Sequence, residues 1–493
     1  MTAVPPLPRW HRLSDRLNPI LVREVQQALS SKAFLGTLFL ALISVLVLAA
    51  VIATMTLGGD DTVGRGAFAA CLGTLAPILV FILPLQAFFS MMQEVRAGSA
   101  EMLLLSHLTP AQIVRGKVQA AAVLFVLYLA IFAPLIALTY LLRGVDVGMI
   151  AFALLLALIV ALAASSLGIA AGALTRARVL TPLWIAMVTV VLGIATGMAI
   201  AGGVGLVMEF AHFSRRAEFW QVLGSIALGL AAALWLFALV AKTQLTHPNE
   251  NRSTPFRVFA VVSVLVIAGW IVLVADRRDL AEALPVFALV ALTIYAGVGL
   301  FLTCEDDELS PRVRTQVPRH GALFAAPFLP GGALGFGFTL LWLALVLALG
   351  LWLPYLLVGG GRPWAVRSAI MIAEYLVIYL GYAAWLRRRL PRGPHGSWLA
   401  RGLVVMTLGL ACLGPMLIEV FLARRGVRWS PLHILNPFFT IDRFDLSGGV
   451  PVIWGLFVAS ILAVMLNIRA LAVRMRDVRR ASLDHRASRA RAA

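Results

Sequence analysis

The residues best placed to do chemistry in this sequence lie in a polar segment, 93–117, between two long apolar stretches. Charged side chains flank an apolar group made of Met102, Leu103, Leu104 and Leu105. A polar turn has no need of such a group, whereas a surface that docks another protein does. The segment therefore predicts recognition of a partner rather than catalysis.

Helix-start signals divide this segment in two. Gly98 interrupts the chain, and we expect a short helix from about Ser99 to Ser106. Glu101 would lie in its first turn, where a carboxylate suits the helix dipole. Thr109 and Pro110 then start a second helix that continues into the next apolar stretch, because Thr accepts orphan amide hydrogens and Pro fits the first helical position.

A second segment of interest, 18–32, precedes the first apolar stretch. Asn18 and Pro19 form another helix-start pair. On a helical projection the polar side chains, Arg23 and Glu24 among them, lie opposite an apolar arc. That arc consists of Leu21, Val22, Val25, Ala28 and Leu29. Such a helix can lie in the membrane interface, and an ordinary cytosolic helix is the alternative.

Glu374 is the one acidic residue well inside an apolar stretch. Placing a charge there costs about 2.5–3.5 kcal/mol on insertion scales. The carboxyl group could bind a proton or a substrate. It could instead be neutral and hydrogen-bonded, with Tyr375, Tyr379 and Tyr382 nearby in the sequence, and we favour this structural role.

An acidic run, 305–308, opens a polar loop at 304–333. We interpret this run as a solvated face rather than a site. The loop occupies the same place in the second half of the chain as 93–117 does in the first, and Leu309-Ser310-Pro311 faintly echoes Leu108-Thr109-Pro110. An internal duplication would explain both matches and stays open as an alternative.

Other catalytic or metal-binding patterns are weak. The cysteines are odd in number and scattered, with no metal-ligand spacing, and the histidines in the loops are isolated. We therefore expect no catalytic site, no metal site and no disulfide framework. The residues concerned are Cys71, Cys304, Cys412, His107, His212 and His433.

The elements that must position these segments are membrane spans. The chain has 493 residues, 61% hydrophobic and 13% charged, with a mean hydropathy of +0.93. Soluble proteins contain about 25% charged residues, and a span needs about 20 apolar residues. The sequence thus predicts an all-α polytopic membrane protein without a cleavable signal peptide. Its twelve predicted spans are 34–57, 66–91, 118–141, 149–173, 179–203, 219–241, 258–275, 283–303, 334–357, 367–386, 401–421 and 451–468.

The basic residues predict the orientation. With the N-terminus inside, the inside segments and span ends contain 29 Lys and Arg and the outside ones 12, which together make the 41 of the chain. This asymmetry follows the positive-inside rule, so both termini are expected in the cytoplasm. It also explains the net charge of +18 without a nucleic-acid partner. We interpret the arginine-rich segment 469–493 as a solvated tail that fixes topology, with attraction to anionic lipid as the alternative.

The order of these elements resembles the membrane subunit of type-2 ATP-binding-cassette (ABC) exporters. The resemblance rests on the interfacial helix, two spans, the pattern E-x-R-x-G-S-x-E-x-L-L, and T-P-x-Q-I-V-x-G-K entering a third span. It covers about residues 18–241 and implies that 18–32, with Asn18, Pro19, Arg23 and Glu24, is an elbow helix. It also implies that 93–117 is the coupling loop, which receives motion from an ATPase. The coupling residues would be Glu94, Arg96, Glu101, Leu104, Leu105, Thr109, Pro110, Gly116 and Lys117.

The resemblance implies a permease subunit in the bacterial cytoplasmic (inner) membrane. A separate cytosolic ATPase would bind the ATP, so no cofactor and no enzymatic activity are expected in this chain. Permease chains of this family pair, as homodimers or heterodimers. The implied organisation is a cytoplasmic N-terminus with the elbow helix (1–33), a six-span permease-like domain (34–241), a linker (242–257), a second six-span domain (258–468) and a basic cytoplasmic tail (469–493).

The chain departs from the family pattern in two ways. It continues into six further spans, and the outside loop near Gly205–Glu218 is short, where the family usually has short re-entrant helices. The stretch 446–450, Leu-Ser-Gly-Gly-Val, resembles the signature of the ATPase subunits, but the chain has no phosphate-cradling G-x-x-x-x-G-K-[ST]. We interpret this stretch as a chance match, and the substrate stays undetermined.

Two other functions remain as alternatives. A single-chain, twelve-span secondary transporter needs polar or charged residues near the midplane of the membrane, and Glu374 is the main candidate. A membrane-embedded, glycosyltransferase-like enzyme needs clustered acids at the membrane surface. The predicted outside acids are dispersed, and Asp60 and Asp61 are their one adjacent pair.

Overall fold

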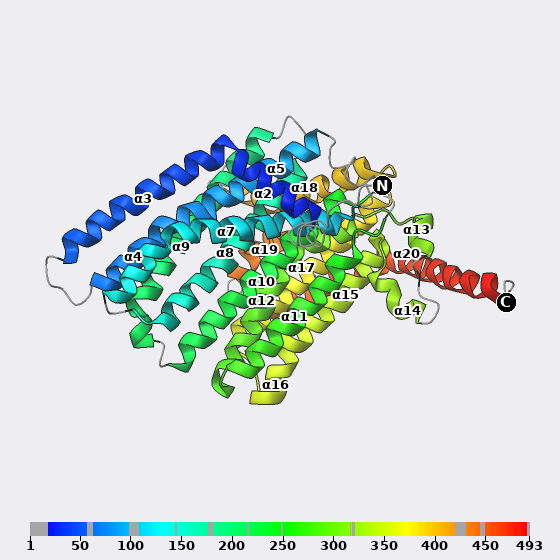
Figure 1. Ribbon diagram of the computed structural model, residues 1–493. Coiled ribbons are helices and arrows are strands. Elements are labelled where there is room, and N and C mark those ends of the chain that lie inside the picture. The colour runs from blue at the N-terminus through cyan, green and yellow to red at the C-terminus, as the bar shows by residue number, and fades with distance from the viewer. Residues whose placement is uncertain are drawn as a thin grey trace, which may run out of the picture. The chain divides into compact units, whose positions relative to one another are not determined.

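A computed structural model describes the chain between residues 18 and 490 (Figure 1). All regular elements of the described residues are helical, and twelve of these helices are long and apolar enough to cross a membrane. The chain is therefore an all-α, multi-pass membrane protein, as predicted. The described ranges are 18–56, 63–97, 108–142, 145–175, 181–213, 216–247, 250–315, 317, 321–419, 430–443 and 449–490.

The helices form two compact units, residues 1–246 and 247–493, so the division falls inside the predicted linker 242–257. The first unit begins with the short helix α2 (Pro19–Ser30). Six spans follow it. They are α3 (Lys32–Thr56), the continuous α4–η1–α5 (Val63–Ala76, Pro77–Ile82, Leu83–Arg96), α7 (Pro110–Leu141), α8 (Val147–Leu174), α9 (Thr181–Phe213) and α10 (Ala217–Leu245).

The second unit also contains six spans, with short helices between some of them. The spans are α11 (Thr254–Val274), α12 (Arg277–Thr303), the continuous α15–η4–α16 (Gly332–Leu347, Ala348–Trp352, Leu353–Val358), α17 (Pro363–Arg387), α18 (Pro394–Leu417) and α20 (Val450–Ala490). The short helices are α13 (Pro311–Thr315), α14 (Ala322–Ala325), η3 (Ala326–Phe328), η6 (Pro431–Leu435) and α19 (Pro437–Asp442).

The spans of the two units pack in the same order. In each unit the second span packs against the first, third and fourth spans, and the fourth packs against the third, fifth and sixth. The third also contacts the first and the sixth in both units. The first unit adds a contact between its second and fifth spans. This shared order agrees with the internal duplication that two short sequence matches left open.

The closest packing in the first unit joins α5 to α8. Gly168 and Gly172 lie one turn apart on α8, and a Cβ atom at Gly172 would lie 2.6 Å from the carbonyl oxygen of Phe88. Small residues at this spacing let two backbones approach, which is how helices associate in lipid. Pro77 and Pro84 also fit this span, because its middle relaxes into a π-helical turn at 77–82.

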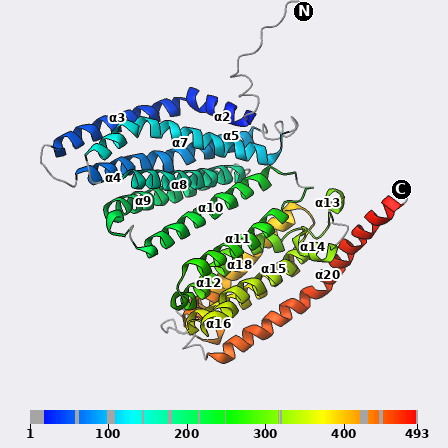
Figure 2. The same ribbon diagram turned by 60° about the horizontal axis from the view of Figure 1, so that its bottom comes forward.

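The predicted solvated tail is wrong as a description of 469–482. Helix α20 continues from the last span to Ala490, and α13 and α14 pack against it (Figure 2). Val478 on α20 is fully buried, in a cluster with Leu309, Val313 and Leu329. Apolar residues recur within the arginine-rich segment, and they anchor one face of the helix.

The loop between the fifth and sixth spans differs between the units. In the first unit the predicted loop near 205–218 is mostly helix, since α9 extends to Phe213 and α10 begins at Ala217. In the second unit η6 and α19 lie between α18 and α20. Helix η6 is held by hydrogen bonds from the Tyr375 and Tyr379 hydroxyls to the carbonyl oxygens of Ile434 and Leu435, both 2.6 Å.

Candidate functional site

Helix α2 begins where the sequence predicts and is seated on α7. The Asn18 side chain accepts a hydrogen bond from the Ile20 amide at 3.1 Å, and its Nδ2 atom donates to the Gln112 carbonyl of α7 at 2.7 Å. Gly116 makes this contact possible, because a Cβ atom there would lie 2.7 Å from Ile20 Cβ. Two predicted regions, 18–32 and the end of 93–117, thus meet in space.

A buried charge cluster joins α2 to α5 and α7. The Lys117 ammonium lies 2.7 Å from Glu24 Oε1 and 3.1 Å from Glu94 Oε2. It also donates to Ser90 Oγ at 2.7 Å, and Ser90 donates to Glu24 Oε2 at 2.9 Å. Arg23 lies 3.6 Å from Glu94 and brings the formal charge of the cluster to zero. We call these five residues the elbow cluster.

Burial gives the elbow cluster its structural importance. The Lys117 side chain is 2% exposed, Glu24 11% and Glu94 9%. Buried charges are tolerated where they are paired and hydrogen-bonded, and removing one partner costs about 3–5 kcal/mol. The cluster therefore fixes α2 to the ends of two spans. Ser90 belongs to the apolar predicted span 66–91, and no local pattern there indicates its role.

Both predicted arcs of α2 are divided between the bundle and the outside. On the polar arc Glu24 lies in the elbow cluster, while Gln26 and Gln27 are exposed. On the apolar arc Ala28 packs against the core of the unit, while Leu29 is 41% exposed. Charged groups of a helix beside lipid need buried partners, and Glu24 has them in the elbow cluster.

The predicted coupling loop is described at its two ends. Arg96, at the end of α5, donates a hydrogen bond to the Thr181 hydroxyl. Thr109 forms the predicted cap of α7 as a reciprocal capping box with Gln112, with Pro110 at the first helical position. The remaining candidates at positions 98–107, Glu101, Leu104 and Leu105 among them, lie outside the described residues.

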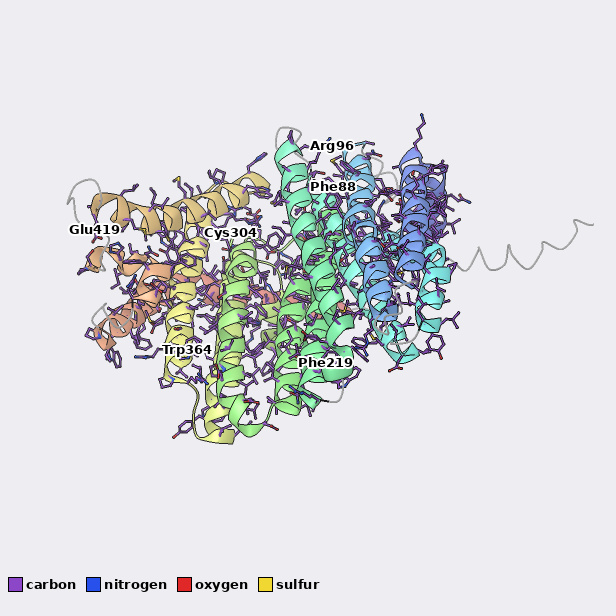
Figure 3. All side chains as sticks on the ribbon, turned by 90° about the vertical axis from the view of Figure 1, so that its left-hand side faces the viewer. Phe88, Arg96, Phe219, Cys304, Trp364 and Glu419 are labelled. Carbon is purple, nitrogen blue, oxygen red and sulfur yellow. The ribbon has the colours of Figure 1, made fainter. Side chains whose placement is uncertain are left out.

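Figure 3 shows which ends of the spans these residues occupy. In the first unit Arg96 lies at one end of the helices and Phe219, near the start of α10, lies at the opposite end. The elbow cluster is therefore near the end of the first unit at which α5 ends and α7 begins. In the second unit Cys304, just after α12, and Trp364, in the first turn of α17, likewise lie at opposite ends.

The second unit places a buried ion pair after its second span. Arg257, fully buried on α11, lies 3.2 Å from Glu305 and donates to the Pro327 carbonyl at 2.6 Å. Glu305 also accepts from the Gly331 amide at 3.1 Å. Burial raises the pKa of the Glu305 carboxyl, and the Arg257 guanidinium opposes that rise. A carboxylate at the end of the second span thus pairs with a buried cation in both units.

The prediction of a solvated acidic face at 305–308 is wrong for Glu305 and Asp307, which are bonded inside the unit. Glu305 is paired as above. Asp307 accepts from the Ala333 amide at 2.7 Å, in the first turn of α15, and Asp306 accepts from the Gly393 amide at 3.1 Å and from Arg387. Asp306, 41% exposed, and Glu308, 60% exposed beside Arg392, fit the solvated interpretation. The run fastens the loop to the ends of three spans.

Glu374 is buried on α17, but the tyrosines near it bond elsewhere. The Tyr375 and Tyr379 hydroxyls donate to η6, and Ser460 donates to the backbone carbonyl of Glu374 at 3.2 Å. Among the described residues its Oε2 atom has no hydrogen-bond partner. The Tyr375 and Tyr379 hydroxyls therefore hold η6 rather than the Glu374 carboxyl group.

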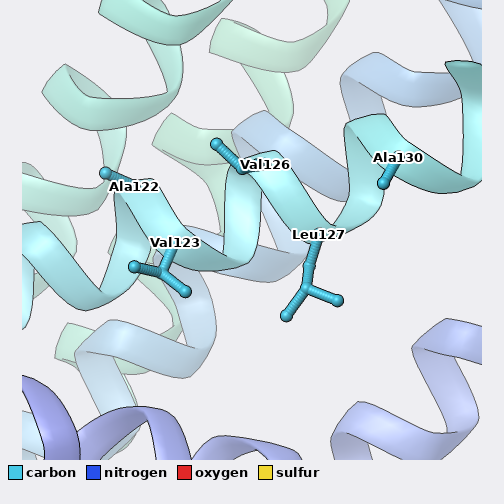
Figure 4. Close-up of a pocket in the computed structure, with 5 residues that line it drawn as sticks. All are labelled: Ala122, Val123, Val126, Leu127 and Ala130. Atoms are coloured by element: carbon cyan, nitrogen blue, oxygen red, sulfur yellow. The ribbon is translucent and has the colours of Figure 1, made fainter. Parts of the chain in front are cut away.

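The described residues hold no group of three or more His, Cys, Asp or Glu side chains that could bind a metal ion. The described part of the first unit has a groove and a second hollow. One, of about 410 Å³, is an open apolar groove along α7, lined by Ala122, Val123, Val126, Leu127 and Ala130 (Figure 4). The other, of about 500 Å³, lies between α2, α5 and α7 and includes residues of the elbow cluster.

The elbow cluster holds the ends of three helices together. The elbow cluster connects three helices next to a loop, and its charges are neutralised by one another. Comparison of the chain with protein-family models, with curated proteins and with solved structures gives no match.

Proposed function

We propose that the chain is the permease subunit of an ABC transporter, which forms the membrane path and couples to a separate cytosolic ATPase. The observation that supports it best is the elbow cluster. Lys117 ties α2 to the end of α5 and the start of α7, the two helices that flank the 98–107 segment. A partner that pushes on this segment would therefore move α2 and the ends of two spans together.

The second unit supports the same proposal. Its spans pack in the order of the first unit, and it has the short helices between its fifth and sixth spans that the first unit lacks. We propose that one chain supplies two permease-type units in the bacterial cytoplasmic membrane, with both termini in the cytoplasm. The 304–333 loop would then occupy the position of a second coupling loop.

Co-purification tests this function. A tagged chain is extracted from its native membrane in mild detergent, and the eluate is assayed for ATP hydrolysis and for associated proteins. We expect a second protein containing G-x-x-x-x-G-K-[ST], and no hydrolysis once that protein is removed. ATP turnover by the chain alone would contradict the proposal.

The lack of a described partner for Glu374 Oε2 favours one other candidate, a secondary transporter that uses this carboxyl group. In proteoliposomes without any ATPase, such a protein would carry a proton flux that Glu374→Gln abolishes. The permease proposal predicts no flux above that of empty vesicles.

A further inference from the structure

The turn between α17 and α18 in the second unit is rich in arginine. Residues 387–401 contain five arginines and no acidic residue. The turn lies at the end of the unit where Figure 3 labels Cys304, because Cys304 packs with Ala383 of α17 and Ala400 of α18 in one buried cluster. In the predicted orientation this end faces the cytoplasm. The arginines are Arg387, Arg388, Arg389, Arg392 and Arg401.

Arg387 holds the turn in one conformation. Its side chain is 4% exposed and forms an ion pair with Asp306. It also donates hydrogen bonds to Ser397 Oγ at 3.1 Å and to the Pro391 carbonyl oxygen at 2.9 Å. These bonds join the last turn of α17 to the first turn of α18, so the other arginines start from a fixed backbone.

The carboxylates of the neighbouring 305–308 run neutralise only part of the remaining charge. The first of them is already paired with Arg257. Glu308 lies 3.0 Å from Arg392. Asp307 caps α15, and its charge also acts on Arg388. Five arginines less the three carboxylates that reach them leave two positive charges on the turn.

These two charges, on Arg389 and Arg401, lie against aromatic rings. The guanidinium carbon of Arg389 is 4.1 Å from the centre of the Trp385 ring. That of Arg401 is 4.4 Å from the Phe301 ring and 5.4 Å from the Trp398 ring. Neither arginine forms a salt bridge within the part of the chain that the structure describes. Stacking occupies the face of a guanidinium and leaves N–H donors at its edge for an acceptor such as phosphate.

The exposed surface next to this turn is that of a membrane interface. Trp398 is 66% exposed and Leu399 49% exposed in the first turns of α18. The exposed side chains that follow on this span are apolar, among them Val405, Met406 and Leu410. Tryptophan is enriched where headgroups meet hydrocarbon. The two arginines are thus at the level of lipid headgroups, with an apolar helix face at the level of the acyl chains.

We propose that the α17–α18 turn binds the headgroups of anionic phospholipids, whose phosphates accept hydrogen bonds from Arg389 and Arg401. The surplus of positive charge selects a lipid with net negative charge over a zwitterionic one, which carries its own cation. The apolar face of α18 selects a lipid over a soluble phosphate. This binding would hold the end of the second unit at the membrane surface, and it is independent of the proposed function.

Native mass spectrometry of the purified full chain tests the proposal. The protein is washed free of lipid in detergent and titrated with phosphatidylglycerol or phosphatidylcholine of identical acyl chains. We expect phosphatidylglycerol to bind about tenfold more tightly. Glycerol 3-phosphate should not displace it. Equal binding of the two lipids, or displacement by glycerol 3-phosphate, would overturn the proposal.

Two variants and a control locate the site. Arg389→Gln and Arg401→Gln should each weaken binding of phosphatidylglycerol about fivefold and leave that of phosphatidylcholine unchanged. Arg389 is exposed, so Arg389→Gln should keep the melting temperature of the lipid-free protein, which separates lost binding from misfolding.

Arg480→Gln is the control. Arg480 is exposed on α20, 12 residues past the last predicted span. At 1.5 Å per residue this is about 18 Å, beyond the headgroup layer. The control should bind phosphatidylglycerol like wild type. If Arg389→Gln and Arg401→Gln also do so, the turn is not a lipid site.

Discussion

At the scale of single residues, the first unit depends on a lysine buried between two carboxylates. Lys117 is 2% exposed and touches α2 and α5 from α7. The ammonium lies within 3.1 Å of both carboxylates, Ser90 donates a hydrogen bond to Glu24, and Arg23 forms a longer ion pair with Glu94 at 3.6 Å. A single substitution at the centre should therefore have a larger effect than one at the exposed Arg23.

Replacing Lys117 with methionine should lower the free energy of unfolding by about 3–5 kcal/mol, since Glu24 and Glu94 would stay buried without their ammonium. Chemical unfolding in detergent measures this. The added change Glu94→Gln should recover part of the loss. Arg115→Met, on an exposed position of the same helix, is the control and should change stability by no more than about 0.5 kcal/mol. Equal effects of Lys117→Met and the control would contradict the role of the cluster.

The contact of α2 with Gly116 on α7 can be tested by substitution. Gly116→Ala would place a Cβ atom 2.7 Å from Ile20 Cβ and 2.9 Å from Asn18 Nδ2, so α2 must move away. We expect faster amide hydrogen exchange over 18–30, although alanine favours helix by about 1 kcal/mol. Gly73→Ala, where no atom lies within 4 Å, should leave this exchange unchanged. Unaltered exchange in Gly116→Ala would show that α2 is not seated on this glycine.

At the scale of elements, local signals in the sequence were sufficient for the helices and their caps. Asn18 and Thr109 were identifiable as caps because each acts on amides two or three residues away. The elbow cluster could not be identified from the sequence, since it joins residues 24, 94 and 117. Residue spacing within a helix carries no information about such distant partners. The acidic run was misread for the same reason: Asp307 caps a helix that begins 25 residues later.

The long helix α20 provides a prediction at this scale. Val478→Asp would bury an unpaired carboxylate against Leu309 and Val313 and should detach the C-terminal turns of the helix. Limited trypsin digestion should then cut faster at the exposed Arg479 and Arg480. Leu483→Asp changes a residue that is 51% exposed and is the control. Equal cleavage of both variants would mean that the end of α20 is not anchored.

At the scale of the whole molecule, the twelve spans were predictable from composition, because lipid requires long uninterrupted apolar helices. The shared packing order of the two units was not predictable from composition, because it concerns which spans contact each other and not which residues they contain. In the sequence, the two units share only a short similarity between 108–110 and 309–311. Helix packing can persist while side chains change.

The orientation is a prediction that reporter fusions can check. Fusions after Ser30, near Thr109 and at Ala493 should all report the cytoplasm, and a fusion near Asp60 should report the outside, as the division of basic residues requires. An outside signal at Ala493 would mean an odd number of spans.

Co-purification tests most directly whether segment 93–117 receives an ATPase partner, as we propose. The tagged chain is purified in mild detergent, and the co-purified ATPase is quantified for wild type, for Leu104→Asp combined with Leu105→Asp, and for Asp60→Asn combined with Asp61→Asn as the control. Apolar anchors dominate interfaces, so the aspartate variant should lose its partner while its abundance stays unchanged, and the control should retain it. A folded aspartate variant that retains the ATPase as well as wild type would contradict the account.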